Sequence, residues 1–125
     1  MDFSERLQLY LEGGMITEKD VENVNKVISL FEKEYGVTLQ EENADTFIAH
    51  LCAAYARLHS EEDIDELPEE VLNELTSLDT YPLSTEVLDK VMKATDIPLN
   101  ATEQGYLLLH INNLISFFQT NDEWN

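Results

Sequence analysis

Two histidines in this sequence have a charged residue seven positions away, and they are the side chains most suited to chemistry. Arg57 follows His50 at this spacing, and Glu103 precedes His110 at the same spacing. Because successive residues of an α-helix are about 100° apart, each charged residue falls two turns away on the flank of its histidine. A histidine titrates at about pH 6.5, so its neutral imidazole can accept a phosphoryl group or transfer a proton.

A structural role is the alternative, because both histidines border an apolar stripe. His50 lies roughly 60 to 90° to one side of the stripe on its helix, and His110 is displaced by a similar angle. A histidine in this position commonly serves packing, and the spacing alone leaves both interpretations open. His59 is predicted to point to the opposite side of the helix that carries His50. The two stripes consist of Phe47, Leu51, Ala54, Tyr55 and Leu58, and of Leu107, Ile111, Leu114 and Phe118.

Standard catalytic signatures are missing. The sequence has no glycine-rich phosphate loop, no GxSxG and no HExxH, so nothing in it supports a conventional enzyme, and no cofactor is expected. An acid–base pair of His110 and Glu103 is a third interpretation, but these residues lie about 10.5 Å apart along the helix axis. With three scattered histidines, Cys52 cannot complete a zinc site, so we expect it to be a small buried hydrophobe. We expect packing roles for Tyr55, Tyr106 and Phe117.

The chain is strongly acidic, and this excludes several classes of partner. Its 125 residues are 43% hydrophobic and include 26 Asp and Glu against 7 Lys and Arg, which gives a formal net charge of -19. Such a charge repels phosphate backbones and anionic membranes, so we expect no direct nucleic-acid binding and no membrane binding. It favours a basic protein partner. No signal-like or long apolar segment is visible, which predicts a cytoplasmic protein.

The elements that position the two histidines are helices. Hydrophobic residues recur at helical spacing nearly throughout, and Gly, Pro and capping residues separate the segments. The sequence predicts a compact, antiparallel, all-α bundle of about five main helices, folded as one domain over residues 1–125. A turn is expected at Tyr81–Pro82, with Ser84 capping the helix after it. The expected helices cover a short opening segment 3–11, then 17–36, 42–58, 68–78, the segment after Ser84, and 100–119.

Two segments of the sequence each carry one of these histidines. The first is Phe47-Ile48-Ala49-His50-Leu51 followed by Arg57-Leu58, and the second is Glu103-Gln104-Gly105-Tyr106-Leu107-Leu108-Leu109-His110-Ile111. The two segments resemble the paired histidine motifs of the PTS regulation domain (PRD) family. The motifs occur in the family's order, with the histidines sixty residues apart, and the resemblance covers residues 20–118.

The resemblance implies a regulatory function in the bacterial sugar phosphotransferase system (PTS). PRDs occur in transcriptional antiterminators of the BglG type, where the phosphocarrier HPr or a sugar-transporter component phosphorylates their histidines. By this resemblance His50 and His110 are the phosphoacceptors, with Arg57 and Glu103 as supporting neighbours. The resemblance further implies a homodimer, or a complex with another PRD-containing regulator, that controls transcription of carbohydrate genes. The alternative is an interaction module that keeps the PRD fold without being phosphorylated.

Overall fold

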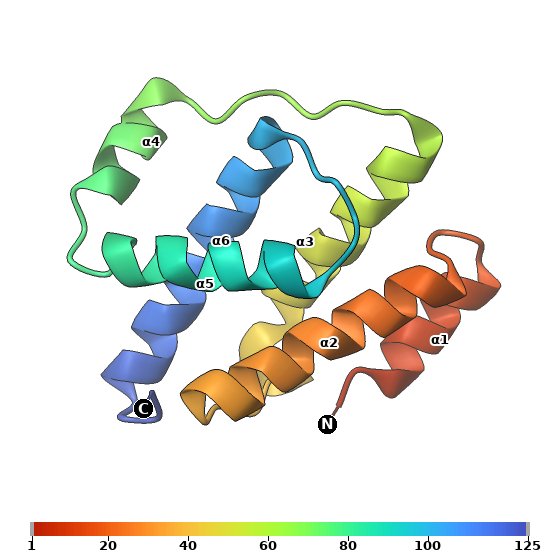
Figure 1. Cartoon of the computed structure of the whole chain (residues 1–125), viewed down its shortest axis with the longest axis horizontal. Coiled ribbons are helices and arrows are strands. Elements are labelled where there is room, and N and C mark those ends of the chain that lie inside the picture. The colour runs from red at the N-terminus through yellow and green to blue at the C-terminus, as the bar shows by residue number, and fades with distance from the viewer. Residues whose placement is uncertain (1, 125) are drawn as a thin grey trace.

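A computed structural model describes residues 2–124, and it consists of helices and their connections (Figure 1). The predicted all-α bundle is confirmed. In chain order the helices are α1 (Ser4–Glu12), α2 (Glu18–Tyr35), α3 (Glu41–Ser60), α4 (Glu69–Thr76), α5 (Tyr81–Ala94) and α6 (Ala101–Thr120). Within the described residues no helix is long and apolar enough to span a membrane.

Local capping sets the start and the end of α2, as the sequence predicts. The backbone N–H of Asp20 donates to Thr17 Oγ1 (3.2 Å), and the N–H of Thr17 donates to Asp20 Oδ2 (2.9 Å). This reciprocal capping box satisfies two backbone donors that the helix start leaves without intrahelical partners. At the other end Gly36 adopts a left-handed conformation with φ 68°, which glycine adopts without steric strain.

The predicted start of the fifth helix is wrong. Tyr81–Pro82 is the first turn of α5 rather than a separate turn, because a proline near a helix start loses no intrahelical hydrogen bond. Ser84 is therefore inside the helix and does not cap it. Its side chain is buried, and the single proton of its hydroxyl is shared between the backbone oxygen of Thr80 (2.9 Å) and Oδ1 of Asn112 on α6 (2.9 Å). The hydroxyl of Thr80 also donates to Asn112, so two side chains fasten the start of α5 to α6.

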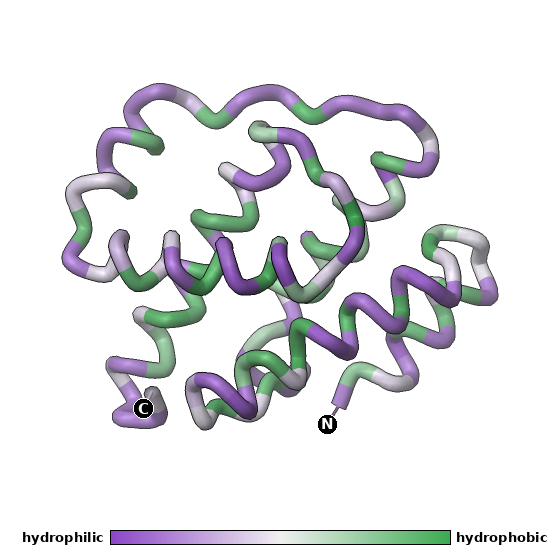
Figure 2. The backbone as a smooth tube through the Cα atoms, viewed as in Figure 1, coloured by the Kyte–Doolittle hydropathy of each residue, from purple (hydrophilic) through white to green (hydrophobic). Residues whose placement is uncertain are grey.

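The core lies where α2, α3, α5 and α6 pack against one another. α6 packs against both α3 and α5, whereas the segment with α4 runs along the upper edge in Figure 1. The segment with α4 is mostly hydrophilic, and it appears as a largely purple stretch along the upper edge of Figure 2. The largest fully buried side chains include Phe31, Ile48, Leu51, Tyr55, Leu107, Ile111, Ile115 and Phe118.

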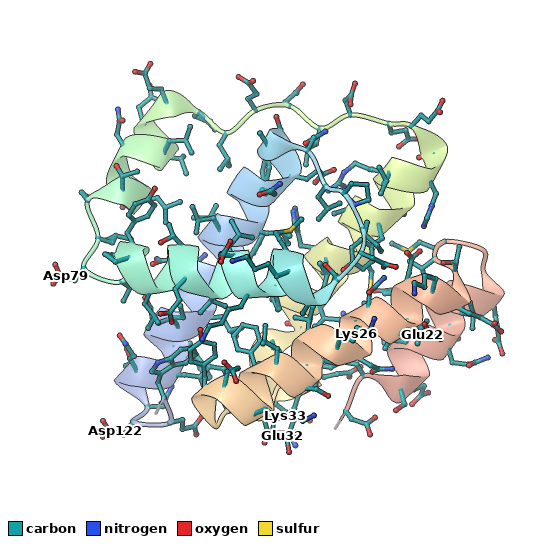
Figure 3. The ribbon with its side chains drawn as sticks, viewed as in Figure 1. Glu22, Lys26, Glu32, Lys33, Asp79 and Asp122 are labelled. Atoms are coloured by element: carbon teal, nitrogen blue, oxygen red, sulfur yellow. The ribbon has the colours of Figure 1, made fainter. Side chains whose placement is uncertain are left out.

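Charged side chains cover the outside of this bundle. In Figure 3 Glu32, Lys33 and Asp122 project away from the core, and all three are exposed. Burying an unpaired charge is costly, so the acidic excess is carried mainly on the solvent side of the helices. Two buried acids, Asp20 and Glu103, are exceptions, and both have hydrogen-bond partners.

Candidate functional site

The structure brings the two predicted histidines together between α3 and α6. The ring centroids of His50 and His110 are 4.5 Å apart, with an angle of 36° between the ring planes. Both side chains are half-buried. Helical geometry predicts that each histidine borders an apolar stripe, and the packing of α3 on α6 makes these two borders meet.

A third ring from α6 contacts the pair. Tyr106 stacks on His50, with the ring centroids 5.6 Å apart and the planes 26° apart. Its hydroxyl donates to the backbone oxygen of Asp65 (2.8 Å), in the connection between α3 and α4. Tyr106 therefore packs as predicted, but it packs on a candidate site residue and links that residue to the acidic α3–α4 connection.

The two predicted charged neighbours form an ion pair with each other. Arg57 Nε donates to Glu103 Oε2 (2.6 Å), and Arg57 Nη2 donates to Glu103 Oε1 (2.8 Å). This two-pronged geometry is the strong form of an arginine–carboxylate contact, and it joins α3 to α6. Glu103 is only 4% exposed. Because the Glu103 carboxylate binds Arg57, only half of a capping box forms at the start of α6, from Glu103 N–H to Asn100 Oδ1 (2.9 Å).

The surroundings of the pair keep both imidazoles neutral. Burial is the largest of the effects that lower the pKa of His50 to about 4; the neighbouring His110 and Arg57 act in the same direction, and Glu103 opposes them. Burial also lowers the pKa of His110. A protonated imidazole has no lone pair for attack, so neutral rings are the form in which histidine acts as a nucleophile. Nε2 of His50 is buried and has no hydrogen-bond partner within residues 2–124.

A groove of about 280 Å³ opens beside His110. It begins where α3 is kinked at Ala44, whose φ of -137° and ψ of 20° are not helical. Phe117 on its rim packs edge-on against Phe118, with the ring centroids 5.5 Å apart, but it is 45% exposed, so the predicted packing role holds for only one side of its ring. The helical period places Phe117 beside the buried Phe118 on α6. It does not show that α3 leaves the Phe117 side of α6 uncovered. The groove walls are Asn43, Ala44, Asp45, Thr46, Phe47, His110, Asn113, Leu114 and Phe117.

His59 and Cys52 lie outside this site. As predicted, His59 points away from the pair; its Nε2 lies 2.7 Å from Oδ2 of the buried Asp20 on α2. Cys52 is fully buried, and burial raises the pKa of its thiol to about 12, which confirms the expected packing role. Over residues 2–124 no group of three or more His, Cys, Asp or Glu side chains is arranged to hold a metal ion.

Comparison with known proteins gives one family and one relative. A family model described as "PRD domain" matches residues 25–114, a range that contains His50, Arg57, Glu103 and His110. The chain is similar to YhfY, described as an uncharacterized protein, of Escherichia coli (strain K12). The two are 26% identical over 109 residues, which cover 87% of this chain and 91% of that protein. No solved structure gives a significant match.

Proposed function

Since the chain belongs to the PRD domain family, we propose that it is a regulatory domain of the bacterial sugar phosphotransferase system, controlled by phosphorylation at the His50–His110 pair. The observation that carries the proposal is the contact between these two half-buried rings, 4.5 Å apart, inside the range that the family model matches. Neither ring has a protein hydrogen bond in the part of the chain that the structure describes, which favours a chemical role over a structural one.

The protonation state of the pair suits phosphoryl transfer from a protein phosphohistidine. In such a transfer the P–N bond of the donor breaks as a new P–N bond forms to the acceptor imidazole. The attacking nitrogen must carry no proton, and the lowered pKa values of both histidines satisfy this condition at neutral pH. The other ring nitrogen keeps its proton throughout, so no separate base is needed.

A phosphoryl group at this position changes the charge of the α3–α6 contact. It adds about 1.5 to 2 negative charges near pH 7, on a chain that already carries -19. The new oxygens attract the guanidinium of Arg57 and compete with Glu103 for it. Glu103 is buried, so loss of its partner leaves an unpaired charge in the bundle and favours rearrangement of the helices. A rearranged surface is a means of switching a protein interface.

The proposed partners follow from the family and from the charge. HPr or a sugar-transporter component would donate the phosphoryl group, and an acidic surface favours encounter with a basic docking face. The output is a protein contact, in a homodimer or with another PRD-containing regulator, that adjusts transcription of carbohydrate genes in the cytoplasm. The proposal includes no direct nucleic-acid binding, because a charge of -19 repels a phosphate backbone.

Phosphotransfer in a purified system tests this function. The protein is incubated with phosphoenolpyruvate, Enzyme I and HPr, and its intact mass is measured under alkaline conditions, because phosphohistidine is labile in acid. We expect addition of phosphate to the wild type and to the matched control His59→Ala, and none to the double variant His50→Ala, His110→Ala. Absence of phosphate on folded wild-type protein, with HPr and with transporter components as donors, favours the interaction module without phosphorylation.

A further inference from the structure

We propose that the histidine pair accepts a single phosphoryl group, which His110 carries, and that His50 acts as a positioning residue beside it. The inference rests on the proposed function and deepens it, because the family motif by itself treats both histidines as acceptors. Access and the contacts available to each ring distinguish the two histidines, and the short distance between the rings disfavours a second phosphoryl group.

Access to the two rings differs. His110 forms part of the wall of the groove of about 280 Å³, and His50 does not. Of the four ring nitrogens of the pair, Nε2 of His50 is the one that is buried without a hydrogen-bond partner within residues 2–124. Tyr106 also covers His50 by stacking on its ring. A phosphoryl donor that enters through the groove therefore reaches His110 first.

The short distance between the rings disfavours a second phosphoryl group. With centroids 4.5 Å apart, phosphorylation of both rings would place two dianions side by side. Repulsion between like charges grows as their separation and the local dielectric fall, and the pair is half-buried. Arg57 lies near the pair, but its single guanidinium is shared with Glu103 and cannot neutralise two dianions. The first phosphoryl group thus makes addition of the second unfavourable.

His50 is placed to respond to a phosphate on His110. The charged and titratable groups that face it are Arg57 on its own helix and Glu103, Tyr106 and His110 on α6. In the unmodified protein its ring is neutral. A neighbouring dianion favours the protonated imidazole, which can donate a hydrogen bond to a phosphate oxygen. The reaction at His110 breaks the donor P–N bond and forms a new one, and His50 then takes a proton from solvent.

A small chemical donor tests the single acceptor without any docking protein. Phosphoramidate transfers its phosphoryl group to histidine and releases ammonia. The His59→Ala variant is the substrate for alkaline mass measurement, so that histidine phosphorylation can come only from the pair. We expect one added phosphate. Long-range ¹H–¹⁵N NMR of the wild type at alkaline pH then identifies the modified ring without further substitutions, and we expect the nitrogens of His110 to shift.

Two results overturn the single acceptor: two phosphates on the His59→Ala variant, or a phosphate found on His50. These failures are distinct from failure of the proposed function. If HPr and transporter components leave the protein unmodified while phosphoramidate modifies His110 once, the regulatory function fails and the single acceptor stands. If HPr adds phosphate to both rings, the regulatory function stands and the single acceptor fails.

The positioning role of His50 has its own readout. Between pH 8 and pH 6 we expect the His50 ring resonances to move in the phosphorylated protein and to stay fixed in the unmodified one, since the dianion raises the pKa of His50 from about 4. In the variants, His50→Gln should retain part of the wild-type lifetime of the phosphate and His50→Ala should shorten it. Resonances that stay fixed in both forms overturn this role.

Discussion

Helix α3 carries histidines on two opposite sides, and the two sides hold them differently. Towards α2, the imidazole of His59 bonds to Asp20 Oδ2 at 2.7 Å, and the Asp20 side chain is only 1% exposed. Towards α6, His50 contacts the rings of His110 and Tyr106 and has no oxygen partner in the described chain. His59 joins two helices, whereas His50 belongs to a pair whose ring nitrogens bind no group within residues 2–124.

This difference separates structural histidines from candidates for chemistry. A buried carboxylate needs donors, so His59 contributes to stability through its bond to Asp20 Oδ2, which also accepts from the N–H of Thr17. On the α2 side, the buried carboxylate of Asp20 binds a histidine. On the α6 side, the buried carboxylate of Glu103 binds Arg57 instead of a histidine. The ion pair holds α3 against α6 and leaves the two imidazoles without a structural bond.

The largest expected effect comes from breaking that ion pair. Arg57→Ala leaves the carboxylate of Glu103, 4% exposed, without its partner, and removing one member of a buried pair costs about 3 kcal/mol. Urea denaturation followed by circular dichroism measures the change in the free energy of unfolding. The control is the double variant Arg57→Met, Glu103→Met, which buries no charge and should recover most of the loss. Equal losses in the single and the double variant would show that packing, rather than the charge, is responsible.

The next effect contrasts the two sides of α3 directly. His59→Ala should lower the free energy of unfolding by about 1 to 3 kcal/mol, because the buried Asp20 carboxylate loses its side-chain partner and keeps only the backbone N–H of Thr17. His110→Ala is the matched change on the other side; it removes no hydrogen bond and should cost less. Chemical denaturation of the two variants under the same conditions gives the comparison. A larger loss for His110→Ala supports the structural role for the pair.

A smaller effect concerns the dependence of stability on pH. The unfolded imidazole of His50 binds a proton below its ordinary pKa of 6.5, whereas the folded one does so only near 4. Within this window the unfolded state binds more protons, so stability falls as the pH is lowered from about 6.5 towards 4. Solvent screens the half-buried ring, which reduces the size of the effect. His50→Gln should weaken this dependence in denaturation series between pH 7 and pH 5, and an unchanged slope would count against a neutral His50.

The smallest effect tests the link from the pair to the acidic α3–α4 connection. Tyr106→Phe keeps the ring that stacks on His50 and removes the hydrogen bond to the Asp65 oxygen, a loss of about 0.5 to 1 kcal/mol at most. Hydrogen exchange should become faster in residues 61–68 and remain unchanged at the start of α2. Uniform acceleration across both regions would mean that the substitution loosens the whole bundle.

The parts of the fold that depend on neighbouring residues are predictable from the sequence. The capping box of Thr17 and Asp20 is such a case, and the positions of His50 and His110 beside their apolar stripes follow from the helical period alone. The bond between Asp20 and His59 is different, because its members are 39 residues apart and no local pattern connects them.

The geometry of the site depends on how α3 packs on α6, and this limits what the sequence predicts. Helical spacing assigns Arg57 to the flank of His50 and Glu103 to the flank of His110, but the bond between them appears only once the helices face each other. Ser84 shows the same limit: its position inside α5 follows from the helix start at Tyr81–Pro82, but its hydrogen bond to Asn112 appears only once α5 packs on α6. The uncovered side of Phe117 likewise depends on the kink at Ala44.

The most direct measurement compares the phosphate content of all three histidines in one sample. Wild-type protein labelled with ¹⁵N is incubated with phosphoenolpyruvate, Enzyme I and HPr, and its imidazole nitrogens are observed by NMR at alkaline pH. We predict a phosphohistidine signature within the pair, at His110, and an unmodified His59. A phosphate on His59, or unmodified rings at all three positions with every phosphotransferase donor supplied, would contradict a phosphoryl-accepting pair between α3 and α6.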